Sequence, residues 1–284
     1  MNNRIAGFEI DDIIRNALKE DIGTGDITTL STVGADRTVK GRYLAKEDGI
    51  MCGLDIVRRV FELLDPSIIF QALVREGSRI RKGDIIASVS GNAGNVLTGE
   101  RVGLNLLQHM SGIATQTARA VDAVRGTRAR IVDTRKTTPG LRVLEKYAVR
   151  AGGGSNHRFN LADGILIKDN HIAAAGGIAN AVAAARLNAP HSLKIEVETE
   201  NFEQIDEALA AGADIIMLDN MTVEDMRKAV ERIKGRAMTE ASGNMGDKTD
   251  KELRAVAETG VDLISIGALT HSVKALDISL KFEY

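Results

Sequence analysis

The sequence predicts an α/β protein: a TIM-like barrel, closed or partly open, preceded by a smaller N-terminal α+β domain. Three observations favour this fold. After about residue 110, short apolar runs alternate with amphipathic helical stretches, as in a parallel sheet covered by helices. Before residue 110, short segments in which apolar and polar residues alternate are interrupted by glycine, as in strands and hairpins. Polar residues directly follow the apolar runs, where a barrel carries its active site.

Length and charge set the limits of this interpretation. With 284 residues, 44% of them hydrophobic, the chain can fill a full barrel or two smaller domains. Its 37 Lys and Arg residues nearly balance 39 Asp and Glu residues, so we expect no nucleic-acid partner. Cys52 is the single cysteine, and no apolar run reaches the roughly 18 residues of a membrane span. The chain opens without the features of a secretory signal, so we expect a cytoplasmic protein with no membrane partner.

Residues 1–110 are expected to form the N-terminal α+β domain. A helix is predicted from Ile10 to Leu18, followed by the polar loop "EDIGTGDITT". "TVKGRYLAKEDGIMCG" and "SIIFQALVREGSRIRKGDIIASVSG" alternate like strands and hairpins. The second of these resembles a lipoyl or biotinyl carrier segment in its turns but has no convincing lysine at a hairpin apex. Residues from about 271 to 284 are expected to pack on the same domain.

Residues 111–270 are expected to form the barrel. The stretch "GERVGLNLLQHMSGIATQTARAVDAVRG" has apolar residues at helical spacing and glycine past its end, so it predicts a helix leading into the barrel. The predicted strands are "ARIVDT", "GILIKDN", "KIEVET", "DIIMLDN", "RAMTEASGN" and "LISIGAL". The predicted helices are "LRVLEKYAVRA", "IANAVAAARL", "NFEQIDEALAAG", "TVEDMRKAVERI" and "DKELRAVAETG". This pattern favours a barrel over a doubly wound sheet, which stays the alternative.

Polar residues gather at the downstream ends of these strands. They are Arg135, Lys136, Lys168, Asp169, Asn170, Glu196, Glu198, Asp219, Asn220, Ser242, Asn244 and Ser265. A single one of them would be an ordinary loop residue. Six strand ends in succession instead predict a site at the C-terminal rim of a barrel.

The residue types at this rim predict a polyanionic ligand. Arg135, Lys136, Arg158 and Lys168, together with His157, offer donors suited to carboxylates and phosphates. The small residues of "EASGN" and "SIGAL" leave backbone N–H groups free to hold a phosphate.

Two acids stand among these cations. Glu198 and Asp219 either pair with the cations or hold hydroxyls and a divalent ion, and Mg²⁺ prefers such carboxylates together with phosphate oxygens. The histidines lack metal-ligand spacing, which argues against structural zinc. Cys52 has no histidine partner in its segment, so we expect it to be a buried small hydrophobe.

Several long motifs, in order, resemble those of the quinolinate phosphoribosyltransferases, also called carboxylating nicotinate-nucleotide pyrophosphorylases, of NAD biosynthesis. The resemblance runs nearly end to end, and motifs of this length are highly specific. The motifs are "EDIGTGDITT", "GERVGLNLLQHMSGIAT", "DTRKTTPGLRVLEKYAVRAGGGSNHR", "LIKDNHI", "EVE", "LDN", "EASGN" and "IGALTHSVKALDISL".

The resemblance implies transfer of a phosphoribosyl group from phosphoribosyl pyrophosphate (PRPP) to quinolinate. Nicotinate mononucleotide, pyrophosphate and CO₂ are the implied products. It implies that Arg135, His157, Arg158 and Lys168 surround the quinolinate carboxylates and that Lys136 reaches the pyrophosphate of PRPP. Arg101 corresponds to an arginine supplied by the neighbouring subunit, which implies a homodimer.

The remaining implied contacts concern the ribose and the phosphates. Glu198 and Asp219 match an acidic pair near the ribose hydroxyls and Mg²⁺, and with Lys136 they are the implied catalytic residues. The remaining implied substrate contacts are Thr134, Ser242, Gly243, Asn244, Ser265, Ile266 and Gly267.

Two other functions stay open on the sequence alone. One is a related phosphoribosyltransferase-like enzyme associated with molybdenum transport, against which the intact "TRKTTPG" and "GGGSNHR" argue. The other is a non-catalytic polyanion-binding barrel. A simple anion trap gains nothing from the carboxylates of Glu198 and Asp219, which argues against this second alternative.

Overall fold

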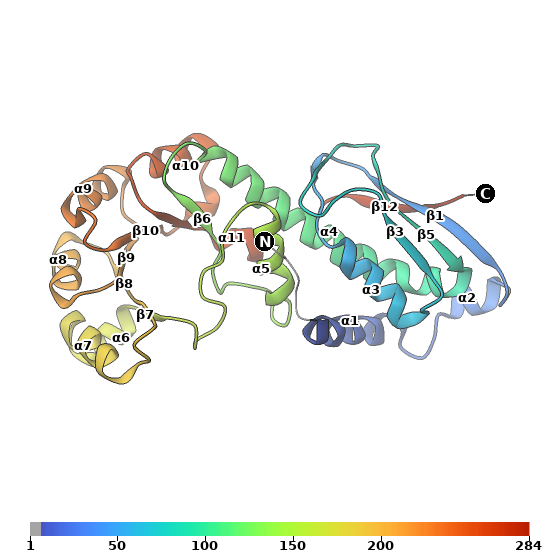
Figure 1. The fold of residues 1–284 in the computed structure, drawn as a ribbon, viewed down its shortest axis with the longest axis horizontal. Helices are drawn as coiled ribbons and strands as arrows, with labels where there is room; N and C mark the ends of the chain where they lie inside the picture. Colours follow the sequence, from blue (N-terminus) through green and yellow to red (C-terminus); the bar gives the residue numbers. More distant parts are fainter. Residues whose placement is uncertain (1–6, 284) are drawn as a thin grey trace. The chain divides into compact units, whose positions relative to one another are not determined.

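A computed structural model describes residues 7–283 of the chain, which divide into two compact units (Figure 1). The first unit comprises the described residues up to Ala118, Thr138–Gly153 and those from Ser272 onward. The second comprises Arg119–Thr137 and Gly154–His271. Within residues 7–283, no helix combines the length and the apolar character needed to cross a membrane.

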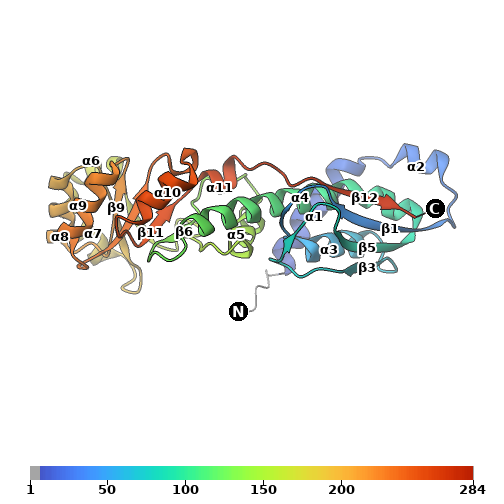
Figure 2. The same cartoon turned by 90° about the horizontal axis from the view of Figure 1, so that it is seen from above.

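The first unit is built on a four-stranded antiparallel sheet in the order β12-β1-β5-β3. Its strands are β1 (Thr38–Ala45), β3 (Ile69–Ala72), β5 (Ile85–Asn92) and β12 (Ile278–Phe282), and a separate small pair joins β2 (Gly49–Ile50) to β4 (Arg79–Ile80). Its helices are α1 (Gly7–Ile22), α2 (Ile27–Thr32), α3 (Leu54–Leu64), α4 (Ala93–Ala123, which continues into the second unit) and α5 (Arg142–Ala151). The C-terminal strand β12 lies antiparallel beside β1, in both Figure 1 and Figure 2.

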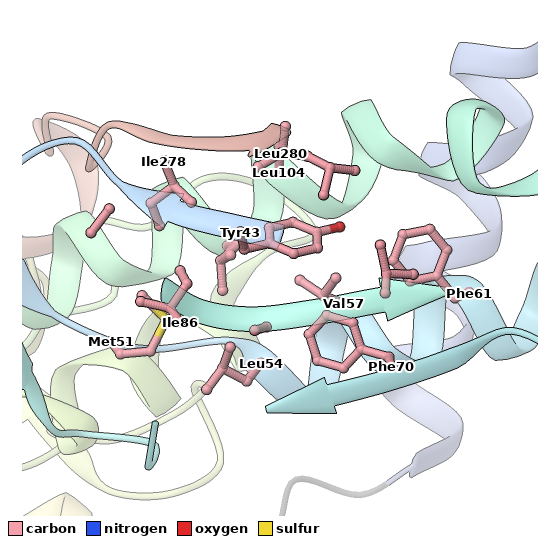
Figure 3. Packing of buried hydrophobic residues seen from close by; sticks show 14 of the residues in the cluster. Tyr43, Met51, Leu54, Val57, Phe61, Phe70, Ile86, Leu104, Ile278 and Leu280 are labelled. Atoms are coloured by element: carbon pink, nitrogen blue, oxygen red, sulfur yellow. The ribbon is translucent and has the colours of Figure 1, made fainter. Parts of the chain in front are cut away.

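The core of this unit lies between the sheet and helices α3 and α4, and its aromatic residues are clustered (Figure 3). The rings of Tyr43 and Phe70 meet edge to face at 5.8 Å, a geometry that aromatic pairs favour. Phe61 packs against Phe70, with its ring centroid 6.2 Å from that of Phe70. Cys52 is fully buried in the same unit, which confirms the expectation for this residue.

The predicted polar loop at residues 20–29 is partly wrong. Helix α1 continues through Ile22, and Asp26 caps the N-terminus of α2. The Asp26 carboxylate accepts hydrogen bonds from the backbone N–H of Thr29 at 3.0 Å and from its hydroxyl at 2.6 Å. An acidic N-cap satisfies the free N–H groups of the first turn, and this is why so polar a segment is helical.

The second unit contains a six-stranded parallel sheet in the order β6-β11-β10-β9-β8-β7, which confirms the predicted α/β class. Its strands are β6 (Arg130–Val132), β7 (Ile165–Ile167), β8 (Ile195–Thr199), β9 (Ile215–Asp219), β10 (Met238–Ser242) and β11 (Leu263–Ser265). The sheet is open between β6 and β7, and an isolated bridge joins Val132 to Ser155. The structure therefore matches the partly open form of the predicted barrel.

Helices α7 (Ile178–Asn188), α8 (Phe202–Ala211), α9 (Val223–Ile233) and α10 (Asp250–Ala257) cover the outer side of this sheet (Figure 1). The unit also contains α6 (Asp169–Ala175), α11 (Ala268–His271) and a short 3₁₀ helix η1 (Met245–Asp247). Asn201, Thr222 and Thr249 cap α8, α9 and α10 with their side chains, so each of these helices begins directly after a strand-end loop. Each strand and helix predicted within residues 111–270 is present, and one of these helices, α5, belongs to the first unit.

Tyr43→Phe is expected to raise the free energy of unfolding of the first unit by about 1 kcal/mol, because a buried hydroxyl without a hydrogen bond destabilises the folded state. The Tyr43 side chain is fully buried, and its hydroxyl finds no partner among residues 7–283. Urea unfolding followed by circular dichroism measures the change. Tyr147→Phe is the control, since the Tyr147 hydroxyl is hydrogen-bonded to Glu76 and its removal should give no gain. A loss of stability in Tyr43→Phe would contradict the prediction.

Candidate active site

A cavity of about 650 Å³ opens at the carboxyl ends of the parallel strands, wholly within the second unit. Parallel pairing brings these ends to one edge: Asp219 of β9 pairs with Ser242 of β10, and Glu198 of β8 pairs with Met217 of β9. The predicted site residues that line the cavity are Thr134, Arg135, Lys136, His157, Arg158, Lys168, Glu198, Asp219, Ser242, Gly243, Asn244, Ser265 and Gly267.

A few of the predicted residues lie elsewhere. Arg101 is exposed on α4 in the first unit. Ile266 is buried, and its backbone N–H donates to the carbonyl of Val132 at 3.0 Å, so this amide is already used by the sheet. Asp169 and Asn170 begin α6 and do not line the cavity.

One rim assignment is wrong for a geometric reason. Glu196 was expected at the end of its strand, but it is the second residue of β8 and only 3% exposed. Because alternate residues of a strand share a face, Glu196 points to the same side as Glu198 but one step deeper in the barrel. It lines a second cavity of about 330 Å³ in the same unit.

Two guanidinium groups, those of Arg135 and Arg158, line the cationic side of the cavity. Burial lowers the pKa of Arg158, and the charge of neighbouring Arg135 lowers it further. The Nη1 of Arg158 donates to the carbonyl of Gly164 at 2.9 Å, which holds the side chain in place. Two like charges on one wall of a cavity favour binding of an anion, and a dianion most of all.

The acidic side of the cavity carries the two predicted carboxylates. The Nζ of Lys168 donates to Glu198 Oε2 at 2.6 Å. Asp219 Oδ2 accepts a hydrogen bond at 2.8 Å from the side-chain amide of Asn220. Each carboxylate keeps one oxygen outside these two bonds, which leaves room for hydroxyl groups or a cation.

The loop that carries Lys136 is tied to the turn after β11. The hydroxyl of Thr270 donates to the carbonyl of Lys136 at 2.8 Å. A side chain at Gly267 would come within 3.1 Å of Lys136 Cδ and within 3.2 Å of His271 Nε2. The absence of a side chain at Gly267 therefore leaves room for the side chain of Lys136 beside the turn.

His157, Glu196 and Glu240 form a cluster that lines the second cavity, and His157 and Glu240 also line the first. The Nε2 of His157 lies 3.1 Å from Glu196 Oε2 and 3.6 Å from Glu240 Oε2. Burial raises the pKa of Glu240 to about 8, and the charge of Glu196 adds to this effect. Glu240 is thus a neutral carboxylic acid at neutral pH, which is how a low-dielectric site accommodates two facing carboxyl groups.

The ligand atoms of this cluster lie within 4.8 Å of one another, close enough to hold a metal ion, but the histidine tautomer argues against one. The backbone N–H of Arg158 donates to His157 Nδ1 at 2.8 Å, so the lone pair of the neutral ring is on Nδ1. Nε2 then carries the proton and donates it toward Glu196. A metal ligand needs a lone pair at that atom.

Sequence reasoning missed Glu240 and assigned no role to Asn220. Glu240 sits inside an apolar run that predicted a buried strand, and an acid in such a position is the signal that could have revealed it. Asn220 was counted among the rim residues, but its contacts depend on the turn after β10, which the sequence does not specify. Asp247 and His271 also line the cavity.

An open parallel α/β barrel with a basic pocket at the carboxyl ends of its strands defines a class of protein that binds small polyanions. Two carboxylates beside so many cations further indicate an enzyme of that class. Comparison with known proteins identifies the family.

The model of the quinolinate phosphoribosyl transferase C-terminal domain matches residues 113–281, and that of the N-terminal domain matches residues 26–111. The chain is 48% identical over 273 residues to the probable nicotinate-nucleotide pyrophosphorylase [carboxylating] of Bacillus subtilis, with 96% of this chain and 93% of that protein covered. It is 47% identical to the corresponding protein of Mycobacterium leprae, with 95% of each covered.

Solved structures agree. The crystal structure of NadC from Streptococcus pyogenes matches with a TM-score of 0.94 at 45% identity, covering 99% of both chains. The nicotinate-nucleotide pyrophosphorylase of Francisella tularensis matches with a TM-score of 0.93 at 40% identity, covering 99% of this chain and 98% of that one. The chain belongs to the quinolinate phosphoribosyltransferase family, which confirms the resemblance seen in its motifs.

Glu240→Gln is expected to change the pH dependence of stability. Glu240 titrates near 8 in the folded chain and near its ordinary 4.5 when unfolded, so the folded state holds an extra proton between these values. The stability from this proton is complete below pH 4.5 and is lost as the pH rises toward 8. Melting temperatures of the two proteins, taken at intervals across this range, should show the wild type losing stability relative to Glu240→Gln.

The control for this measurement is Glu203→Gln, which alters an exposed carboxyl on α8 of the same unit. Its melting temperature should follow that of the wild type at every pH. A difference between wild type and Glu240→Gln that stays constant with pH would contradict the prediction, because it would mean that Glu240 is ionised throughout.

Proposed function

We propose a division of roles among the pocket residues for the reaction of this family. The chain is a decarboxylating pentosyltransferase of NAD biosynthesis. It converts quinolinate and PRPP to nicotinate mononucleotide, pyrophosphate and CO₂. The adjacent guanidinium groups of Arg135 and Arg158 carry the proposal, since the dianion quinolinate relieves their mutual repulsion.

Arg135, Arg158 and Lys168 hold the two quinolinate carboxylates in this proposal. Quinolinate places its carboxylates on neighbouring ring carbons, which suits two guanidinium groups that line the same cavity. Nicotinate offers only one carboxylate and would leave one cation without a partner. The pocket should therefore select quinolinate over nicotinate.

His157 takes a different role from the one implied by the resemblance. Its Nδ1 accepts from the backbone N–H of Arg158, and its Nε2 points to Glu196. We therefore assign His157 to holding Arg158 in position. The buried Glu196, 3.1 Å from Nε2, fixes the orientation of the ring.

PRPP occupies the remainder of the pocket. Lys136 reaches the pyrophosphate as a point charge, and the Ser242–Asn244 and Ser265–Gly267 turns hold phosphate groups with Thr134 beside them. Ile266 belongs to the second turn but does not donate to a phosphate, because its backbone N–H is hydrogen-bonded to Val132 of β6. Glu198 and Asp219 accept hydrogen bonds from the ribose hydroxyls.

Mg²⁺ fits the donor set beside the ribose. Glu198 and Asp219 place carboxylate oxygens on one wall of the cavity, and Mg²⁺ takes one or two carboxylates together with phosphate oxygens. When bound with PRPP, the ion would neutralise negative charge on the pyrophosphate. Glu198 and Asp219 are the residues that would hold it.

The reaction requires fixed positive charge more than acid-base catalysis. Breaking the bond from ribose C1 to pyrophosphate produces an anionic leaving group, which Lys136 stabilises. The ring nitrogen forms the new bond to C1 and becomes positively charged. The bond from C2 to its carboxylate then breaks, and the electron pair left on C2 is stabilised by the adjacent cationic nitrogen before a proton replaces the CO₂.

The cytoplasm remains the proposed compartment. A related protein of Arabidopsis thaliana, 45% identical over 295 residues, is described as chloroplastic, and one of Nicotiana tabacum as mitochondrial. The family therefore occurs in more than one compartment.

Lys136→Ala is expected to lower kcat at least about 100-fold, because it removes the charge that stabilises the leaving group. The test incubates each protein with PRPP, Mg²⁺ and either quinolinate or nicotinate and follows nicotinate mononucleotide and CO₂. Lys251→Ala, an exposed lysine on α10, is the control and should match the wild type. Wild-type protein that forms product from neither acid would favour the molybdenum-associated or non-catalytic alternative.

Arg101→Ala is expected to abolish activity while leaving the fold intact, because we propose that Arg101 acts in the site of a partner in a homodimer. Mixing Arg101→Ala with Lys136→Ala chains should recover about a quarter of wild-type activity, since half of the dimers formed at random are mixed and each has one complete site. Steady-state rates after subunit exchange measure this. No recovery in chains shown to exchange would contradict a shared site.

A further inference from the structure

We propose that Asn220 is a positioning residue that holds the Asp219 carboxylate and the Ser242–Asn244 turn in one fixed arrangement. The inference rests on the proposed function, in which Asp219 contacts the ribose of PRPP and the turn holds a phosphate. Asn220 follows β9 directly and lines the cavity beside both groups.

The backbone of Asn220 connects the two neighbouring strands. Its φ of +54° is left-handed, a conformation that asparagine adopts more readily than most residues. The Asn220 N–H donates to the carbonyl of Ser242 at 3.1 Å, one step beyond the last paired residues of β9 and β10. The chain leaves β9 bonded to the start of the turn.

The side-chain amide of Asn220 donates one hydrogen bond and accepts another. Its Nδ2 donates to Asp219 Oδ2 at 2.8 Å, and its Oδ1 accepts from Asn244 Nδ2 at 3.3 Å. An amide provides a donor and an acceptor at the same distance from the backbone, whereas a carboxylate provides acceptors only. An aspartate at this position would keep the bond to Asn244 and would repel Asp219.

The turn closes directly over this amide. A Cβ atom at Gly243 would lie 2.2 Å from Asn220 Oδ1 and 2.6 Å from its Cγ, so the Asn220 side chain occupies the space of a side chain at residue 243. Gly243 itself has a φ of +91°, and Asn244 is also left-handed at +50°. Two successive unusual conformations are thus packed against one side chain.

This packing makes the acid and the turn a single rigid element. Both contact PRPP in the proposed function, whereas the hydrogen bonds of Asn220 go to Asp219, Asn244 and Ser242, none of which is a cation assigned to quinolinate. Loss of the amide should therefore affect PRPP and leave quinolinate binding nearly unchanged. A residue needed only for folding would affect both substrates.

The test compares Asn220→Asp and Asn220→Gly with the wild type in steady-state kinetics, each substrate being varied in turn. Both variants tolerate the left-handed backbone, so the fold should persist. We expect KM for PRPP to rise about tenfold or more, and KM for quinolinate to stay within about twofold. Equal effects on both substrates, or none, would overturn the proposal.

Asn188→Asp is the matched control. It makes the same change from amide to carboxylate on an exposed residue at the end of α7, in the same unit. Its kinetics should equal those of the wild type. A rise in KM for PRPP in this variant would show that added negative charge alone causes the effect and would overturn the proposal.

A double-mutant cycle with Gly243→Ala tests the contact itself. In the wild type the added methyl group collides with the side-chain amide of Asn220, whereas in Asn220→Gly only its close approach of 2.8 Å to the backbone nitrogen of residue 220 remains. Gly243→Ala should therefore raise KM for PRPP by a larger factor in the wild-type background than in Asn220→Gly. Equal factors in the two backgrounds would mean that the two residues act independently.

Binding of ribose 5-phosphate separates this proposal from the reaction itself. Calorimetry with this probe needs no turnover, so it works even if wild-type protein were to form no product from quinolinate and PRPP. We expect Asn220→Asp to bind ribose 5-phosphate about tenfold more weakly than the wild type. Equal affinity would overturn the positioning role, whereas an inactive wild type that shows this difference would overturn only the proposed reaction.

Discussion

The parallel register of β8, β9 and β10 is the constraint on which the site depends. Side chains at the ends of three adjacent strands cannot be moved independently, because each strand is hydrogen-bonded to the next. Asp219 is fixed beside Ser242 in this way, and Glu198 is fixed one strand away. The positions of Asp219 and of the start of the Ser242–Asn244 turn, which we propose to contact PRPP, are therefore set by the backbone of the sheet.

The charged side chains of the site differ in how far they are buried. The cations that line the cavity are at least partly exposed, whereas Glu196 and Glu240 are buried to 3% exposure or less. Glu196 favours the charged form of Arg158, which burial and Arg135 oppose. Since Glu240 is kept protonated, the cluster compensates part of the positive charge without cancelling it. The pocket remains attractive to anions although the chain has a formal charge of only -2.

The strands and their polar ends could be predicted because each carries its own signal. In a segment such as "DIIMLDN", the apolar residues predict a buried strand, and the polar residues after them predict where that strand ends. No comparable sequence pattern predicts how deep in the barrel a polar side chain lies. Glu196 and Glu198 are two positions apart and share a face, so the sequence alone could not separate the buried acid from the rim acid. Asp26 was missed for a related reason, since a polar turn and a capped helix begin with the same residues.

His109 is a residue of the family motifs whose contacts could be identified only from the folded structure. It lies in the middle of α4, where the sequence offered no interpretation, and its Nε2 lies 2.9 Å from the fully buried Glu145 of α5. The same carboxylate accepts from the backbone N–H of Thr138 at 3.1 Å. Thr138 is only two residues after Lys136. A histidine 27 residues before that lysine thus takes part in fixing the segment that follows it, through a buried acid that no local pattern would connect to either.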